Sequence, residues 1–466
     1  MSKTIGASSA STMEVTRMRH PRVLIIVQNL PVPLDRRVWL ECQALTAQGY
    51  SVSVICPKGP GDPRFAIIDG VGIYKYRPAP DAKGVAGFVV EFVWSWVRTA
   101  LLSLRVRRER GFDVIQACNP PDTYWLLARL WRARGVRFVF DQHDLNPELF
   151  VSRFGTPQSL GQRIQYRGLL WLERMTYRTA DRVISTNASY KKVAETRGGR
   201  NPATVTIVRS GPDTTVMRPV YPDPEFRAGA EHLLVYLGIM GPQDNVEVVL
   251  DLVQELVHRR GRTGVRAVVM GFGDCLEELK VRSSELALDE YVLFTGRVGL
   301  ATIAQYLSAA DIGIGPDEKS PLNDVSTMNK TMEYMAYALP SVSFDLIETR
   351  MSGGDAALYI PSGDLAAFAD AVESLLDDEQ RRVSLGLAAR DRVTTELDWR
   401  AQAQAYVGVF DDLTENAPDE ERRANWPFRP RPTAQLAEDG PRFVGLDHGE
   451  LGSFIAARAR LGDGVG

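Results

Sequence analysis

Short runs of consecutive apolar residues alternate with longer amphipathic stretches along most of the chain. In the first half, runs of strand length occupy residues 23–27, 51–56, 113–117, 136–140 and 182–185. Between several of them lie helical stretches, such as 37–48 and 123–134. Near-continuous apolar strands that alternate with helices are typical of a parallel sheet covered on both faces. This half of the chain therefore predicts a doubly wound α/β domain.

The same alternation begins again after Pro219. Its predicted strands are 233–237, 266–270, 292–294, 312–314 and 341–344, and its predicted helices are 246–259, 275–286, 300–309, 331–338 and 365–376. The link from 209 to 224 is rich in proline, which suits an interdomain hinge. We expect one domain at 21–215 and a second at 216–399, with residues 400–416 packing back on the first. Such domains bind ligands at the carboxyl ends of their strands, here facing the cleft between them.

The two ends of the chain lack this regular pattern. Residues 1–20 are polar and rich in Ser and Thr, without an apolar run after their basic residues, so they do not resemble a signal peptide. We expect a disordered tail there and an irregular tail at 417–466, with a short helix at 450–459.

Composition narrows the class of protein. A length of 466 residues exceeds what one hydrophobic core usually supports, and 44% apolar with 24% charged residues is ordinary for a globular protein. The net charge of −3 provides no general attraction to nucleic acid. The four cysteines are scattered without metal-ligand spacing, as expected for reduced thiols in a cytoplasmic protein.

One amphipathic stretch, 88–110, differs from the other helices. Glu91, Ser95 and Arg98 recur at helical spacing and leave a broad apolar face with two tryptophans, followed by a basic end. Its charges make a bilayer span unfavourable. Two interpretations remain: a helix lying in the surface of the inner membrane, which would make the protein peripheral, or a helix packed on the first-domain sheet.

Five motifs follow one another along the chain in the order that is found in a known family. The chain carries PLDRRVW early, NPPD and HDLNPE midway, and GPQD and NDVSTMNKTMEYMA late. With these motifs at matching strand ends, the chain resembles the family 4 glycosyltransferases, in the bacterial branch that builds cell-surface polysaccharides. The resemblance runs from about residue 22 to 410. It implies the GT-B fold, two Rossmann-like domains facing a cleft, and retaining transfer from a UDP- or GDP-sugar to a lipid-linked or polysaccharide acceptor. It implies no cofactor, and because no D-x-D triplet stands at a strand end we expect no obligatory metal.

The late motif predicts the donor site. Asn329 and Lys330 precede a helical segment, whose free N–H groups and dipole favour an anion, and Lys330 adds a positive charge suited to a diphosphate. The resemblance makes Glu333 the residue that binds ribose, and we expect the catalytic residues to be His143, Glu333 and Lys330. The alternative is an ordinary surface pair of Lys330 and Glu333.

This chain departs from the family pattern at two places. Many relatives carry a further glutamate where this chain has Val325, and the usual Arg and Lys after the first strand of the second domain are replaced by the segment 238–244, which includes Gly241. The diphosphate clamp is therefore unusual. Arg297 is the best replacement for the missing charges, although an exposed structural arginine is an equal alternative.

The first domain contributes the remaining candidates. The resemblance places His143 beside the transferred sugar, and a histidine at a strand end facing a cleft suits that role. Arg36 and Arg37 either line the acceptor side or are solvated at a helix start, and Asn119 and Asp122 either contact the cleft or cap a helix.

Two glycines and two rival functions complete the expectations. Gly271 and Gly273 either approach the nucleotide closely or form a plain tight turn. A nucleotide-sugar epimerase of the same fold, or a non-catalytic binding or scaffold protein, are the alternatives to a transferase.

Overall fold

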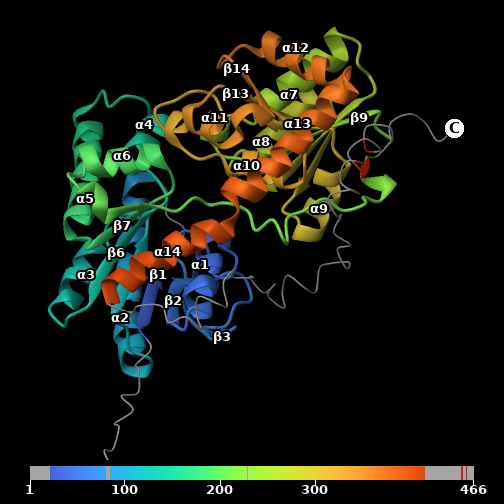
Figure 1. Ribbon diagram of the computed structural model, residues 1–466. Coiled ribbons are helices and arrows are strands. Elements are labelled where there is room, and N and C mark those ends of the chain that lie inside the picture. The colour runs from blue at the N-terminus through green and yellow to red at the C-terminus, as the bar shows by residue number, and fades with distance from the viewer. Residues whose placement is uncertain (1–20, 80–83, 228, 415–452, 455–457, 459–466) are drawn as a thin grey trace, which may run out of the picture.

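The computed structural model describes residues 21–79, 84–227, 229–414, 453, 454 and 458, and Figure 1 shows two α/β domains. Each domain is built around one sheet with helices on its faces. The predicted tails and the helix expected at 450–459 lie outside the described residues, except for residues 453, 454 and 458.

The first domain holds an eight-stranded sheet in the order β3-β4-β2-β1-β5-β6-β7-β8. All neighbouring strands are parallel except β3 and β4, which form an antiparallel edge. The strands are β1 (Arg22–Ile26), β2 (Ser51–Pro57), β3 (Phe65–Ile68), β4 (Val71–Tyr76), β5 (Val114–Cys118), β6 (Arg137–Gln142), β7 (Arg182–Ser185) and β8 (Val205–Ile207). The sequence analysis did not predict β3, β4 or β8, because β3 and β8 span only four and three residues and β4 is interrupted by Gly72 and Lys75.

The helices of this domain are α1 (Arg36–Ala47), α2 (Gly84–Glu109), α3 (Trp125–Arg132), α4 (Asn146–Phe154), α5 (Leu160–Thr179) and α6 (Ala188–Thr196). Helix α1 begins at Arg36 because the Asp35 carboxylate accepts a hydrogen bond from the Val38 N–H at 3.1 Å. This cap fixes the first turn of α1, and with it the two arginines, at the carboxyl end of β1.

The second domain holds a six-stranded parallel sheet in the order β11-β10-β9-β12-β13-β14. Its strands are β9 (His232–Ile239), β10 (Val265–Phe272), β11 (Val292–Gly296), β12 (Ile312–Gly315), β13 (Ser341–Phe344) and β14 (Ala357–Ile360). Its helices are α7 (Glu247–Gln254), α8 (Leu276–Glu285), α9 (Leu300–Ala309), α10 (Asn329–Ala336), α11 (Ile347–Gly353), α12 (Leu365–Leu376) and α13 (Glu379–Arg392). In both sheets the strand order reverses beside the first strand, which is where doubly wound domains bind ligands.

The last long helix, α14 (Trp399–Thr414), returns to the first domain and lies against α1 (Figure 1). Trp399, Tyr406 and Phe410 are fully buried in the same apolar core as β1 and β2. The hydroxyl of Tyr406 donates to the Gln116 side chain at 2.6 Å, inside the sheet. The first domain is therefore completed by residues that follow the second in sequence.

Helix α2 packs with its small polar side inward. Ser95, Thr99 and Ser103 are buried against the sheet, whereas Val93 and Leu101 are more than half exposed. This corrects the expectation that Ser95 belongs to an outward polar face. Within the part of the chain that the structure describes, no helix is both long and apolar enough to cross a bilayer.

Candidate active site

His143 lies on the loop after β6, and the side chain of Asn119 holds that loop in place. The Asn119 carbonyl oxygen accepts from the N–H groups of His143 at 2.7 Å and Asp144 at 3.1 Å, while its amide donates to the Asp144 carbonyl at 2.8 Å. The His143 ring nitrogen Nε2 lies 2.7 Å from Asp141 Oδ2. This contact fixes the orientation of the imidazole ring. Asn119 thus supports the loop rather than capping a helix.

Arg37 is buried beneath His143 and is not a solvated arginine at a helix start. Its guanidinium lies 3.0 Å from both Asp141 Oδ1 and Glu41 Oε1, and its Nε lies 3.1 Å from the His143 ring. It also donates to the Val208 carbonyl at 3.0 Å. Through these contacts Arg37 holds Asp141, Glu41 and the His143 ring in position.

The two buried acids beside Arg37 carry different charges. Burial raises the pKa of Glu41 well above its ordinary value, and the nearby Asp141 charge raises it further. Burial also opposes ionisation of Asp141, but Arg37 and His143 outweigh that effect and hold the pKa of Asp141 well below its usual range. Gln116 donates to both acids, at 2.8 Å to Glu41 and 3.0 Å to Asp141. Glu41 is therefore protonated and Asp141 ionised.

Cys118, Asp141 and His143 place three potential metal-ligand atoms within 4.8 Å of one another. The set does not fit a metal ion, because the Arg37 guanidinium already contacts both Asp141 and His143 and would repel a second cation. Burial also raises the pKa of the Cys118 thiol well above its ordinary value, so a thiolate ligand is disfavoured.

Asp122 is a buried carboxyl that is linked to His143 through Asn119. It accepts hydrogen bonds from the amide groups of Asn119 and Asn146. Burial raises its pKa to about 7. Asp122 thus braces Asn119 and, through it, the His143 loop, and it makes no cap to α3.

Lys330 and Glu333 both lie on helix α10 of the second domain, but their side chains do not pair with each other. Lys330 Nζ lies 2.6 and 2.8 Å from the two carboxylate oxygens of Asp317, and both side chains are buried. Glu333 forms its ion pair with Arg36 of α1, across the interface between the domains. The surface-pair alternative is wrong for this reason, and Arg36 contacts the second domain rather than only a first-domain wall.

The other predicted donor-side residues occupy loops of the second domain. Asn329 is exposed at the first position of α10, and the Gly241 N–H donates to Asp244 at 2.9 Å. Arg297 is exposed, with its guanidinium 5.4 Å from the centre of the Phe272 ring. None of these three is in contact with His143.

Gly271 and Gly273 lie where β10 ends beside β9, with φ values of 144° and 157°. A Cβ atom on Gly271 would stand 1.8 Å from the Gly238 carbonyl oxygen, and one on Gly273 would stand 2.5 Å from that of Met240. The close approach is to the neighbouring strand, so the structural alternative accounts for both glycines.

Val325, where many relatives carry an acid, packs between the domains. It joins an apolar cluster with Leu145 and Tyr190 of the first domain and Leu322 of the second. Its carbonyl accepts from Asn187 at 2.9 Å. In this chain the position stabilises the interface between the domains.

Sequence reasoning placed Asp317 near the sugar site, and it missed four polar residues that support these side chains: Glu41, Gln116, Asp141 and Tyr406. For Asp141 a signal existed, because a carboxylate interrupts the apolar run of β6 two residues before His143. Gln116 likewise interrupts β5. Tyr406 carries no such signal, since its partner lies 290 positions away.

Two Rossmann-like domains that meet with the carboxyl ends of their sheets define the GT-B class of glycosyltransferase. The family model described as "Glycosyl transferase 4-like domain" matches residues 34–211, and "Glycosyl transferases group 1" matches 231–378. The chain belongs to the GT-B glycosyltransferases of family 4 and is a glycosyltransferase.

One relative is similar to this chain in sequence, and two solved structures are similar to it in fold. The α-maltose-1-phosphate synthase of Mycolicibacterium smegmatis is 27% identical over 302 residues, 59% of this chain and 73% of its own. The sucrose-phosphate synthase of Thermosynechococcus elongatus superposes with a TM-score of 0.68 at 18% identity, covering 85% of this chain and 100% of its own. Anabaena HepE, solved in complex with UDP-glucose, superposes with a TM-score of 0.62 at 15% identity, covering 85% and 100%.

Proposed function

We propose that the protein transfers a sugar, with retention of configuration, from a UDP- or GDP-sugar to a lipid-linked or polysaccharide acceptor during cell-surface glycan synthesis. The observation that carries this proposal is the ion pair between Arg36 and Glu333, which joins the start of α1 in the first domain to α10 in the second. Arg37, the next residue of α1, contacts the His143 ring, so this ion pair lies close to His143. Residues from both domains thereby meet where a donor and an acceptor would have to be held together.

In the proposed reaction Glu333 binds the ribose hydroxyls, and Lys330 with the N-terminus of α10 binds the diphosphate. His143 contacts the donor sugar. The bond from the sugar C1 to the phosphate oxygen breaks while a bond from C1 to the acceptor oxygen forms on the same face. The acceptor hydroxyl proton passes to the leaving phosphate oxygen, so the enzyme's task is to hold both reactants and stabilise charge.

The proposed place of action is the cytoplasmic face of the membrane, with the protein bound peripherally. Support comes from α2, whose solvent side carries Val90, Val93, Val97 and Leu101, each at least 43% exposed. A surface helix normally turns such a face inward, and a contiguous exposed apolar face marks an interaction site.

Calorimetry with UDP- and GDP-sugars tests the donor site. Glu333→Ala should abolish measurable binding, whereas Glu278→Ala, an exposed glutamate on α8, should bind like the wild type. Unchanged affinity in Glu333→Ala would remove Glu333 from the site. Incubation of donors with and without membrane extract then separates the functions: acceptor-dependent transfer supports the proposal, an isomerised donor indicates an epimerase, and neither binding nor turnover indicates a scaffold.

A further inference from the structure

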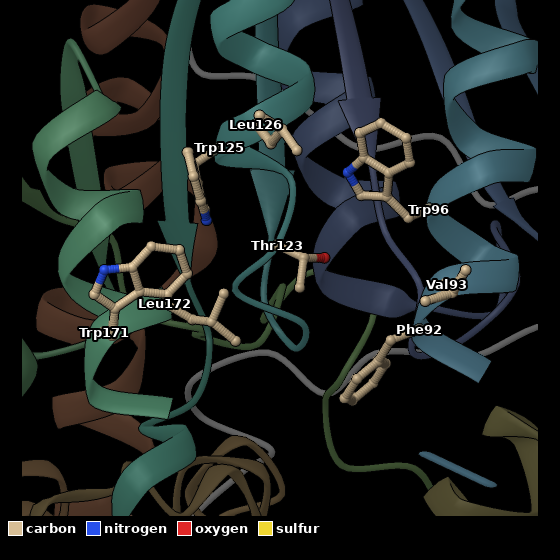
Figure 2. Close-up of a pocket in the computed structure, with 8 residues that line it drawn as sticks. All are labelled: Phe92, Val93, Trp96, Thr123, Trp125, Leu126, Trp171 and Leu172. Carbon is tan, nitrogen blue, oxygen red and sulfur yellow. The ribbon is translucent and has the colours of Figure 1, made fainter. Parts of the chain in front are cut away.

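A groove on the outer side of the first domain lies between α2, α3 and α5, and Figure 2 shows its walls. Trp125, Trp171 and Leu172 stand on one side, and Phe92, Val93 and Trp96 stand on the other. Thr123 and Leu126 complete the lining. The hollow measures about 380 Å³, within the range of small-molecule sites.

The walls of this groove are almost entirely apolar although they are open to solvent. Seven of the eight lining side chains are hydrophobic. Leu126 is 44% and Trp171 54% exposed, and Trp171 packs edge-on against Trp125 with ring centres 5.7 Å apart. An open apolar hollow in a folded protein is a binding surface for an apolar group.

The groove is flanked by positive charge. Four exposed arginines stand within four positions of a lining residue on its three helices, namely Arg98, Arg129, Arg167 and Arg174. Arg129 lies over the Trp125 ring at 5.9 Å from its centre. A hydrophobic groove within a basic surface complements an amphiphile with a hydrocarbon chain and an anionic head, and a protein partner would need an acidic face instead.

One end of the groove lies beside residues that support the active site. Thr123 directly follows Asp122, whose carboxyl braces Asn119 and thereby the His143 loop. On the opposite wall Phe92 follows Glu91, which accepts a hydrogen bond at 3.4 Å from Gln28 at the carboxyl end of β1. A chain lying in the groove would therefore have its head group on the side of the cleft.

We infer that this groove binds the hydrocarbon chain of a lipid-linked acceptor whose phosphate faces the arginines. The inference rests on the proposed function for the identity of the acceptor, while the groove itself is tested without any transfer. It assigns Phe92, Trp96, Leu126 and Trp171 to chain binding and predicts that acceptors are selected by chain length.

Binding is measured with 11-bromoundecyl phosphate, because bromine quenches indole fluorescence on contact and three of the eight tryptophans line the groove. The wild type should be quenched, and ethyl phosphate should have no effect. Leu126→Asp should weaken the apparent affinity at least tenfold. Val281→Asp, on α8 at 59% exposure, is the matched control and should behave like the wild type. Trp171→Ser provides a second groove variant, and circular dichroism verifies the fold of each.

Equal quenching of wild type and Leu126→Asp, or no quenching by the long chain, would overturn the inference. The transfer assay separates its failure from that of the proposed function. A KM increase for long-chain acceptors alone in Leu126→Asp, with short-chain transfer unchanged, supports both. Transfer that ignores chain length leaves the proposed function standing and overturns the groove; chain binding without transfer to any acceptor supports the groove and counts against the proposed function.

Discussion

The buried cluster of Arg37, Asp141 and Glu41 makes a sharp prediction about charge. Arg37 and Asp141 are ionised while burial keeps Glu41 protonated, so the cluster is neutral. Glu41→Gln exchanges one neutral group for another and should cost at most about 1 kcal/mol of unfolding free energy. Asp141→Asn removes the counter-ion, but Glu41 can then ionise beside Arg37, which limits the loss to about 1–3 kcal/mol.

The double variant, Glu41→Gln with Asp141→Asn, leaves Arg37 without any carboxylate. A buried charge that loses its partner typically costs roughly 3–5 kcal/mol, so the double loss should clearly exceed the sum of the two single losses. Urea unfolding followed by tryptophan fluorescence measures all four proteins. Additive losses would refute the idea that Glu41 replaces Asp141.

The pH dependence offers an independent check on Glu41. The folded protein keeps a proton that the unfolded chain releases above the ordinary pKa of 4.5. Wild-type stability should therefore fall relative to Glu41→Gln as the pH rises from 4.5 toward the raised pKa, by at most about 1.4 kcal/mol per pH unit. A difference that stays constant with pH would mean that Glu41 is ionised in the folded state.

Three further outcomes follow from the site. The pKa of about 7 for Asp122 lies above the ordinary value of 3.8, so wild-type stability should decline as the pH rises from about 3.8 to about 7. Asp122→Asn should therefore gain in urea midpoint relative to wild type between about pH 4 and pH 7, and a pH-independent difference would contradict this. Arg36→Ala should weaken nucleoside diphosphate binding several-fold in calorimetry because a cation beside α10 is lost, whereas tighter binding would mean that Arg36 only occupies the Glu333 carboxylate. Lys330→Met should cost roughly 3–5 kcal/mol in urea unfolding because Asp317 is left buried without its cation, and adding Asp317→Asn should restore most of the loss.

The central strands could be predicted because a strand buried on both faces is a continuous apolar run. The long helices could be predicted as the amphipathic stretches between these runs. The helix predicted at 365–376 coincides with α12, and that at 300–309 with α9. The edge strands β3 and β8 were not predicted, because four and three residues are too short to show a period. The inward side of α2 was also unpredictable, since period alone does not say which side meets the sheet.

The site shows the same division between local and distant information. His143, Lys330 and Glu333 stand at strand ends or a helix start, which sequence can locate. Their partners come from elsewhere: Lys330 pairs with Asp317, and Glu333 pairs with Arg36 from the other domain. A pairing between distant segments leaves no periodic trace in a single sequence, so it becomes visible only when the fold brings the segments together.

These two ion pairs reduce the positive charge that is free to stabilise a leaving diphosphate. Lys330 would be the main positive charge on the second-domain side, since the usual basic pair is missing from 238–244, but Asp317 already neutralises it. A diphosphate bound at α10 must then either draw Lys330 away from Asp317 or obtain positive charge from another element. Arg36 is a cation in contact with Glu333 of α10, and it comes from the first domain. Charge stabilisation of the leaving group would therefore depend on the two domains being held together, which gives the apolar cluster around Val325 a direct bearing on the rate of transfer.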